Sequence, residues 1–199
     1  MPDTGAPHFI PFADPTDLVR DWPALSEDVA EAVADGLDAA GGLVAVKSAI
    51  FTGTQTDSVT AGNNLTVTDL EITHEVADVA NKLIISAFLG AAASSIGDAA
   101  VGIAIHDGSG LIAVGDTDGI RTSVSAGGVV SGTRTNQVVT MPHITFVHTP
   151  GEGSKTYTVR AVNIRNDTRT IFINRNEADP DLRDIPRAVS SLVIQEVKV

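Results

Sequence analysis

The chain has 199 residues, no cysteine and a formal net charge of −12. The lack of cysteine excludes a disulfide scaffold, a cysteine-based zinc site and a thiol nucleophile, and the acidity is unfavourable for nucleic-acid binding. No apolar run approaches the ~18–20 residues that a membrane-spanning helix needs, and the first ten residues lack the basic and apolar regions of a secretory signal. We therefore expect one folded domain, alone or with an appendage, and neither a nucleic acid nor a membrane as partner.

The first 24 residues are predicted to be extended and irregular. Pro2, Pro7, Pro11, Pro15 and Pro23 recur too often for a helix or a central strand. Large apolar side chains nevertheless punctuate this segment, and they cannot form a core of their own. We expect them to dock on the chain's own domain or on a partner, and we take as candidate attachment residues Phe9, Phe12, Leu18, Val19 and Trp22.

Residues 26–40 are predicted to form one short amphipathic helix. Ser26 can cap it, acidic residues follow in the first turn, and Gly41-Gly42 ends it. Its apolar stripe is narrow and would not hold a helix in isolation. The stripe supplies three further candidate interface residues, spaced four apart, namely Val29, Val33 and Leu37.

From residue 43 onward, short Val-, Ile- and Thr-rich segments alternate with turn residues. This pattern predicts a mainly β domain, an antiparallel two-sheet β-sandwich of jelly-roll-like type. It divides the chain into an arm with its helix, residues 1–43, and a β-sandwich domain, residues 44–199. Asp107-Gly108 predicts a tight hairpin, and Asn166-Asp167 a second one. The expected strands cover residues 43–52, 65–72, 82–89, 101–106, 111–115, 121–125, 137–148, 155–163, 169–174 and 190–199, with a short edge strand at 57–60.

The search for reactive chemistry gives little. Asp116 and Asp118 resemble part of a calcium loop, but the remaining ligands of that motif are missing. His143 and His148 lie five apart in one expected strand and so point to opposite faces. A second acidic group is best explained as a surface loop with ion pairs, with cation binding as the open alternative; it comprises Glu177, Asp179, Asp181 and Asp184. With no nucleophile elbow and no phosphate-binding loop, we expect no enzyme activity, no metal and no cofactor.

Assembly into a homotrimer is predicted from what the chain lacks. Aromatic residues make up only 4% of the sequence, and large rings normally supply much of the burial in a β-sandwich. The helical stripe is also too thin to be covered by one sandwich. Charge is uneven, because residues 1–50 carry nine acids and two bases whereas residues 121–199 carry seven acids and ten bases. The arginines of the last third either pair within the chain or pair between subunits.

Two stretches resemble virion proteins of tailed bacteriophages. Residues 11–43 begin PFADPTDLVRDWPALSEDVA and lead through the Ala-rich helix to Gly41-Gly42-Leu43, which resembles the N-terminal segment of phage minor tail proteins and tail-fibre modules. Residues 144–198 contain ITFVHTP, KTYTVR, TIFINR, IPR and SLVIQEV in this order, which is similar to the C-terminal β-domain ending of phage appendage proteins.

The resemblance implies a non-enzymatic virion component, a homotrimer whose N-terminal arm attaches to other virion proteins of the tail or capsid. Its location would be the particle surface after assembly in the host cytoplasm, with the β-sandwich exposed for contact with a host surface receptor. The chain lacks the repetitive stalk of long fibres, which favours a stubby tail-tip appendage or a capsid decoration protein. A host-encoded carbohydrate-binding module is a third alternative, weakened by the presence of a single Tyr and a single Trp.

Overall fold

The computed structural model describes residues 42–199 except 96–97, 117, 132–137, 152 and 179–186. The described part consists of strands and their connections and contains no helix. The strands are β1 (Leu43–Phe51), β2 (Gln55–Val59), β3 (Asn64–Glu75), β4 (Lys82–Phe88), β5 (Ala92–Ser94), β6 (Asp98–His106), β7 (Leu111–Ile112), β8 (Ala126–Ser131), β9 (His143–His148), β10 (Ser154–Asn163), β11 (Arg169–Ile173) and β12 (Ser190–Val197).

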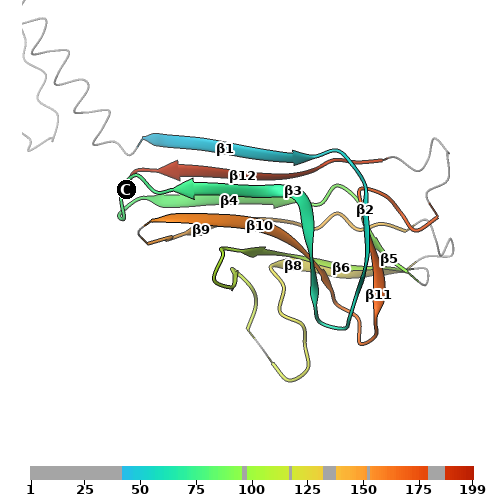
Figure 1. The fold of residues 1–199 in the computed structure, drawn as a ribbon. Coiled ribbons are helices and arrows are strands. Elements are labelled where there is room, and N and C mark those ends of the chain that lie inside the picture. The colour runs from blue at the N-terminus through green and yellow to red at the C-terminus, as the bar shows by residue number, and fades with distance from the viewer. Residues whose placement is uncertain (1–41, 96–97, 117, 132–137, 152, 179–186) are drawn as a thin grey trace, which may run out of the picture.

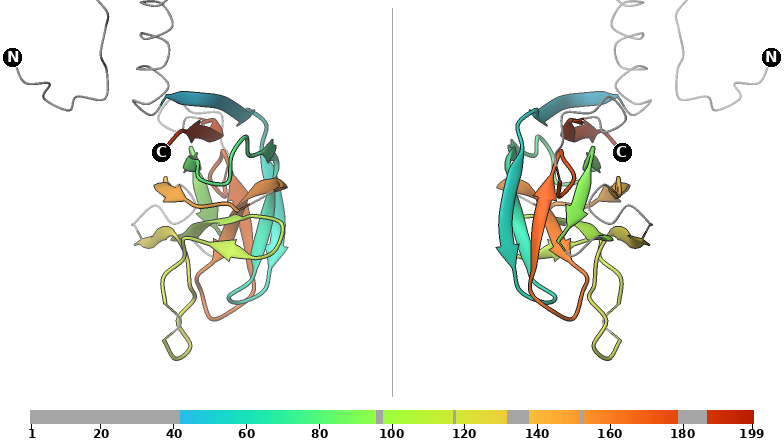
Figure 2. Two further views of the ribbon diagram at one scale, coloured as in Figure 1. Left: turned by 90° about the vertical axis from the view of Figure 1, so that its left-hand side faces the viewer. Right: turned by 90° about the vertical axis from the view of Figure 1, so that its right-hand side faces the viewer.

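These strands form two antiparallel sheets packed face to face, which confirms the predicted β-sandwich (Figure 1). One sheet has the order β1-β12-β4-β9, and the other has the order β2-β11-β5-β6-β10-β3 with β7 and β8 also paired to β6. The end-on views in Figure 2 show the two layers. The four-stranded sheet therefore has one face toward the core and one face toward solvent.

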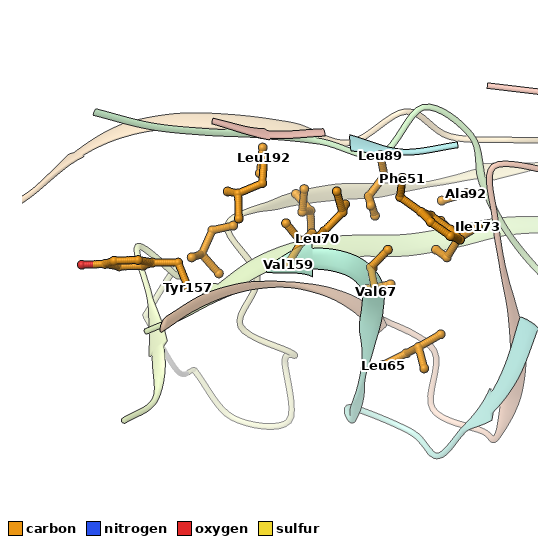
Figure 3. Close-up of a cluster of buried hydrophobic side chains, with 14 of the residues drawn as sticks. Phe51, Leu65, Val67, Leu70, Leu89, Ala92, Tyr157, Val159, Ile173 and Leu192 are labelled. Carbon is orange, nitrogen blue, oxygen red and sulfur yellow. The ribbon is translucent and has the colours of Figure 1, made fainter. Parts of the chain in front are cut away.

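The core lies between the layers because the strands alternate. In β12, Leu192 and Ile194 are fully buried while the next residues, Val193 and Gln195, are half-buried, as expected for side chains that point alternately to the two faces of a sheet. Leucine, isoleucine, valine and alanine fill most of the core (Figure 3). Tyr157 lies at one end of this cluster, and its hydroxyl oxygen points away from the other side chains drawn.

Strand β3 bends at Asp69, which lies in the left-handed region with φ of 59°. The pairing of β3 with β10 shifts at this point, between Thr158 and Arg160 of β10. Extra residues on one strand of a pair form a bulge that bends the strand. The bend lets β3 pair with β10 along both of its halves.

Asn174 joins the ends of several strands just after β11. Its backbone φ is 60°, and its buried side-chain amide donates to the carbonyl oxygens of Phe51 at 2.8 Å and Gly53 at 2.9 Å. Its side-chain oxygen accepts a hydrogen bond from the Ser190 hydroxyl at 2.6 Å. One residue thus links the end of β1 and the start of β12 to the end of β11.

Several predicted elements are confirmed and others are wrong. The hairpin at Asp107-Gly108 is present, since His106 of β6 pairs with Leu111 of β7, and the short edge strand is β2, paired only with β11. The second hairpin is wrong, because β10 pairs with β3 and β6 whereas β11 pairs with β2 and β5. Residues 121–124 form no strand, and the Gly127-Gly128 segment, predicted as a turn, belongs to β8.

The predicted arm and helix, residues 1–41, lie outside the described residues. The division of the chain at residue 43 therefore stays a prediction. The first described residue, Gly42, accepts a hydrogen bond from the backbone of Lys198 at 2.9 Å. Gly42 accordingly lies beside the end of β12, at the edge of the four-stranded sheet.

Candidate interaction surface

The outer face of the β1-β12-β4-β9 sheet carries exposed apolar side chains on a layer that nothing in the described part of the molecule covers. Its apolar side chains include Val46, Ile50 and Val147, which are 53%, 61% and 67% exposed. Half-buried Ile84, Phe88 and Val193 lie between them on β4 and β12. Exposed or half-buried apolar groups are thus present on all four strands of this face, and a gathering of apolar side chains on a protein surface is typical of an interaction site.

The polar groups on this face are almost all uncharged. Hydroxyl and amide side chains alternate with the apolar ones, as in the hydrogen-bonded pair Ser86–Thr145, whose oxygens are 2.9 Å apart. Lys82 and His143 stand near opposite ends of the face. Among the outward-facing residues of these four strands there is no Asp, Glu or Arg, although the whole chain carries a net charge of −12. Depletion of charged residues is typical of the buried centre of a protein interface.

The pairing of the strands arranges these side chains in rows across the sheet. One row runs from β1 to β9 through Val46, Gln195, Ile84 and Val147. The next row runs through Ser48, Val193, Ser86 and Thr145, and the one after it through Ile50, Ser191, Phe88 and His143. The two margins of the face therefore present chemically similar groups at the first two levels.

A shallow hollow of about 230 Å³ lies on the same face. Its lining is mainly apolar and includes Phe88 and Val193, with Ser86, His143 and Ser191 beside them. It is therefore suited to an apolar side chain approaching from another molecule.

A second, polar group of residues closes one end of the sandwich interior. The Asp107 carboxylate accepts hydrogen bonds from the Ser109 hydroxyl at 2.6 Å and from the backbone of Ser109 and Gly110. Burial opposes its ionisation, but these bonds, together with Lys155 at 3.4 Å, hold its pKa well below the usual range. The Asp107 carboxylate thus stabilises the turn between β6 and β7.

His148 and Tyr157 lie beside Asp107. Their rings meet edge to face, with centroids 5.9 Å apart. Burial lowers the pKa of His148, with Lys155 adding to the effect, and burial raises the pKa of Tyr157 to about 12. Both groups are therefore uncharged at neutral pH.

Glu196 anchors a buried network at the same end of the sandwich. Its carboxylate accepts hydrogen bonds from Asn81 at 2.7 Å and from the backbone of Ala77 at 2.8 Å, and it lies 2.9 Å from the His74 ring. Burial opposes ionisation, but these three contacts outweigh it and lower the pKa of Glu196. The network ties β12 of one sheet to β3 of the other.

The structure separates the reactive candidates taken from the sequence. His143 is exposed on the outer face whereas His148 faces the interior, as their spacing predicted. Asp118 forms an exposed ion pair with Arg121 at 2.7 Å. Within the described residues, no three acidic or histidine side chains gather to hold a metal, and no helix is long and apolar enough to span a membrane.

All eight candidate attachment and interface residues lie outside the described residues: Phe9, Phe12, Leu18, Val19, Trp22, Val29, Val33 and Leu37. Of the acidic group, Asp179, Asp181 and Asp184 are likewise outside them, whereas Glu177 is among the described residues.

Sequence reasoning missed the outer face of the sheet, although a signal was present. The strands β1, β4 and β12 read LVAVKSAIF, KLIISAF and SSLVIQEV, with apolar residues at consecutive positions. A strand with one face in water normally alternates apolar and polar residues, and a nearly continuous apolar run is typical of a strand that is covered on both faces. These runs therefore predict that something covers the outer face.

Comparison with known proteins does not identify a family for this chain. No protein-family model matches the chain, and no curated protein is similar to it in sequence. A solved structure with a partly similar arrangement is the VP2 subviral particle of infectious bursal disease virus, with a TM-score of 0.33 and 10% sequence identity. The match covers 78% of this chain and 41% of the VP2 chain. A likeness at this TM-score carries no inference about function.

Proposed function

We propose that this chain is a non-enzymatic structural protein of a tailed-bacteriophage virion, a short trimeric appendage attached to the particle by residues 1–43. The sequence resemblance of residues 11–43 and 144–198 to phage tail and appendage proteins supports the virion assignment. The observation that carries a structural role is the exposed, acid-free outer face of the β1-β12-β4-β9 sheet, since a surface of this composition is suited to protein–protein contact.

The attachment role is assigned to the N-terminal arm. Residues 1–41 carry nine acidic side chains and one arginine, together with the chain's only Trp. Large aromatic side chains are the residues that most often dominate binding energy at interfaces. The sandwich would then be the exposed part of the appendage and the part that meets a host surface.

Immunogold labelling of intact particles tests the location. An antibody raised against the β-sandwich should label particles at the tail tip. Labelling spread over the capsid would instead support a capsid decoration protein. Complete particles that carry no label at all would refute the virion assignment.

Sedimentation of the full-length chain at micromolar concentration and moderate salt tests the assembly. The proposal requires a species of about three times the chain mass of 20.6 kDa. A single monomeric species would refute the trimer while leaving the virion assignment to the labelling experiment.

A further inference from the structure

We infer that the outer face of the β1-β12-β4-β9 sheet is the contact between copies of this chain, and that the β1 margin of one copy meets the β9 margin of the next around an axis parallel to the strands. The inference rests on the trimer proposed above and specifies which surfaces form it. The occupant of the face is thus a second copy of the same chain.

The rows across the sheet are the first argument. Rotation about an axis parallel to the strands leaves every residue at its own height along that axis. Val46 on the β1 margin would therefore meet Val147 on the β9 margin of the neighbouring copy, and Ser48 would meet Thr145, because each of these pairs shares a row. Apolar groups would meet apolar groups and hydroxyl groups would meet hydroxyl groups.

The hollow on the face is the second argument. Ile50 is 61% exposed on β1 and shares its row with Phe88 and His143, which line the hollow beside β9. Within one chain these residues lie at opposite margins of the sheet. In the ring, Ile50 of one copy enters the hollow of the next, as a knob fills a hole.

Charge is the third argument. Two copies of a protein that carries a charge of −12 repel one another wherever acidic surfaces meet. The outer edge strand β3 of the other sheet, for example, displays Asp69, Glu71 and Glu75. On the face proposed here, the outward-facing residues include no acidic side chain, so copies approach without that repulsion.

The number of copies follows from the trimer proposed above. A head-to-tail contact uses two different margins, covers both of them on every copy and closes into a ring.

This arrangement places residue 42 of every copy at the same end of the assembly. Gly42 is bonded to Lys198 beside the end of β12, and an axis parallel to the strands keeps corresponding ends together. Residue 42 of all three copies would therefore lie at the end of the assembly that the proposed attachment requires.

Cysteine cross-linking of the full-length chain tests the contact, because the natural chain contains no cysteine. The variant carrying both Val46→Cys and Val147→Cys is oxidised with diamide and analysed on a denaturing gel. Within one chain the two positions are three strand spacings, or ~14 Å, apart, and a disulfide needs Cα atoms within about 7 Å. We therefore expect a covalent three-chain species from the double variant and none from either single variant.

The outcomes separate this inference from the proposed function. If the unmodified chain sediments as a trimer but the double variant yields no three-chain species, the contact lies elsewhere and the inference is overturned while the trimer stands. Efficient dimers from Val46→Cys alone would show β1 meeting β1, which also overturns it. A monomeric natural chain overturns the trimer and this inference together.

A charge substitution gives an independent readout. Ile50→Asp should convert the trimer into monomers at micromolar concentration while the circular dichroism spectrum is unchanged. Val129→Asp is the matched control, because Val129 is 51% exposed but lies on β8 in the other sheet. A trimer that persists in Ile50→Asp would overturn the inference, as would equal dissociation of both variants.

Discussion

Asn174 offers the most quantitative test of how the sandwich is held together. Replacing it with Ala removes the donor to the buried Phe51 carbonyl and to the Gly53 carbonyl, and it removes the acceptor of the Ser190 hydroxyl. Each buried group left without a partner costs about 1–3 kcal/mol, and holding Ala at a φ of 60° costs about 1 kcal/mol more. Asn174→Ala should therefore lower the free energy of unfolding by about 4 kcal/mol, which is a large share of the ~5–15 kcal/mol of a typical domain.

Glycine substitution separates the two contributions. Asn174→Gly also loses the hydrogen bonds but tolerates the left-handed backbone, so it should be about 1 kcal/mol more stable than Asn174→Ala. Asn163 is the matched control, because it is equally buried and its side chain contacts Val59, Asp167 and Arg165 without a positive φ. There the order should reverse, with Asn163→Gly about 1 kcal/mol less stable than Asn163→Ala.

Urea unfolding at one fixed chain concentration measures all four variants, since association contributes to apparent stability. The reasoning would be refuted by a loss below about 1 kcal/mol for Asn174→Ala. It would also be refuted if glycine and alanine ranked in the same order at both positions.

Four further predictions address other parts of the chain. The pKa of Glu196 in the folded protein lies below its ordinary value of 4.5, so the stabilisation that its carboxylate supplies is present above pH 4.5 and is lost as the pH falls through the folded pKa. Glu196→Gln should therefore lower the free energy of unfolding at pH 7. Urea unfolding at pH 3 should show a smaller difference in that free energy between the variant and the natural chain. Gly90→Ala should lower the melting temperature or abolish soluble expression, because a Cβ atom there would overlap the carbonyl oxygen of Val189. Tyr157→Phe should change the free energy of unfolding by less than about 1 kcal/mol, because the Tyr157 hydroxyl is buried with no hydrogen-bond partner among the described residues, and a larger loss would show that this hydroxyl is bonded. Trp22→Ala should weaken attachment to the particle by about 2–4 kcal/mol in a competition for incorporation while leaving the melting temperature unchanged; a large thermal loss with normal incorporation would contradict the attachment role.

The sequence alone determined the class of the fold, because alternation is a local property. Leu65 and Val67 alternate with Thr66 and Thr68 in a period of two, and this pattern predicts a strand whatever lies around it. The hairpin at Asp107-Gly108 was equally readable, since both the turn residues and the two strands that it joins are contiguous. The opposite faces of His143 and His148 followed from the same period.

Strand partners were decided only by the tertiary structure. Residues 155–163 and 169–174 are adjacent in sequence and were expected to pair, yet β10 pairs with β3 and β6 while β11 pairs with β2 and β5. Strand pairing depends on which strands the core places side by side, and no local propensity encodes this. The Gly127-Gly128 segment is a second example of a prediction that strand pairing overturned. Its composition is typical of a turn, yet the segment pairs with β6 as part of β8.

The candidate interaction surface combines both kinds of information. The continuous apolar runs of β1, β4 and β12 were visible in the sequence as a sign of strands covered on both faces. Only the sheet order placed Val46 and Val147 at opposite margins of one face and at the same height. The register between strands is set by contacts between residues far apart in the chain, and this register turns a run of apolar residues into a surface that a second copy can match.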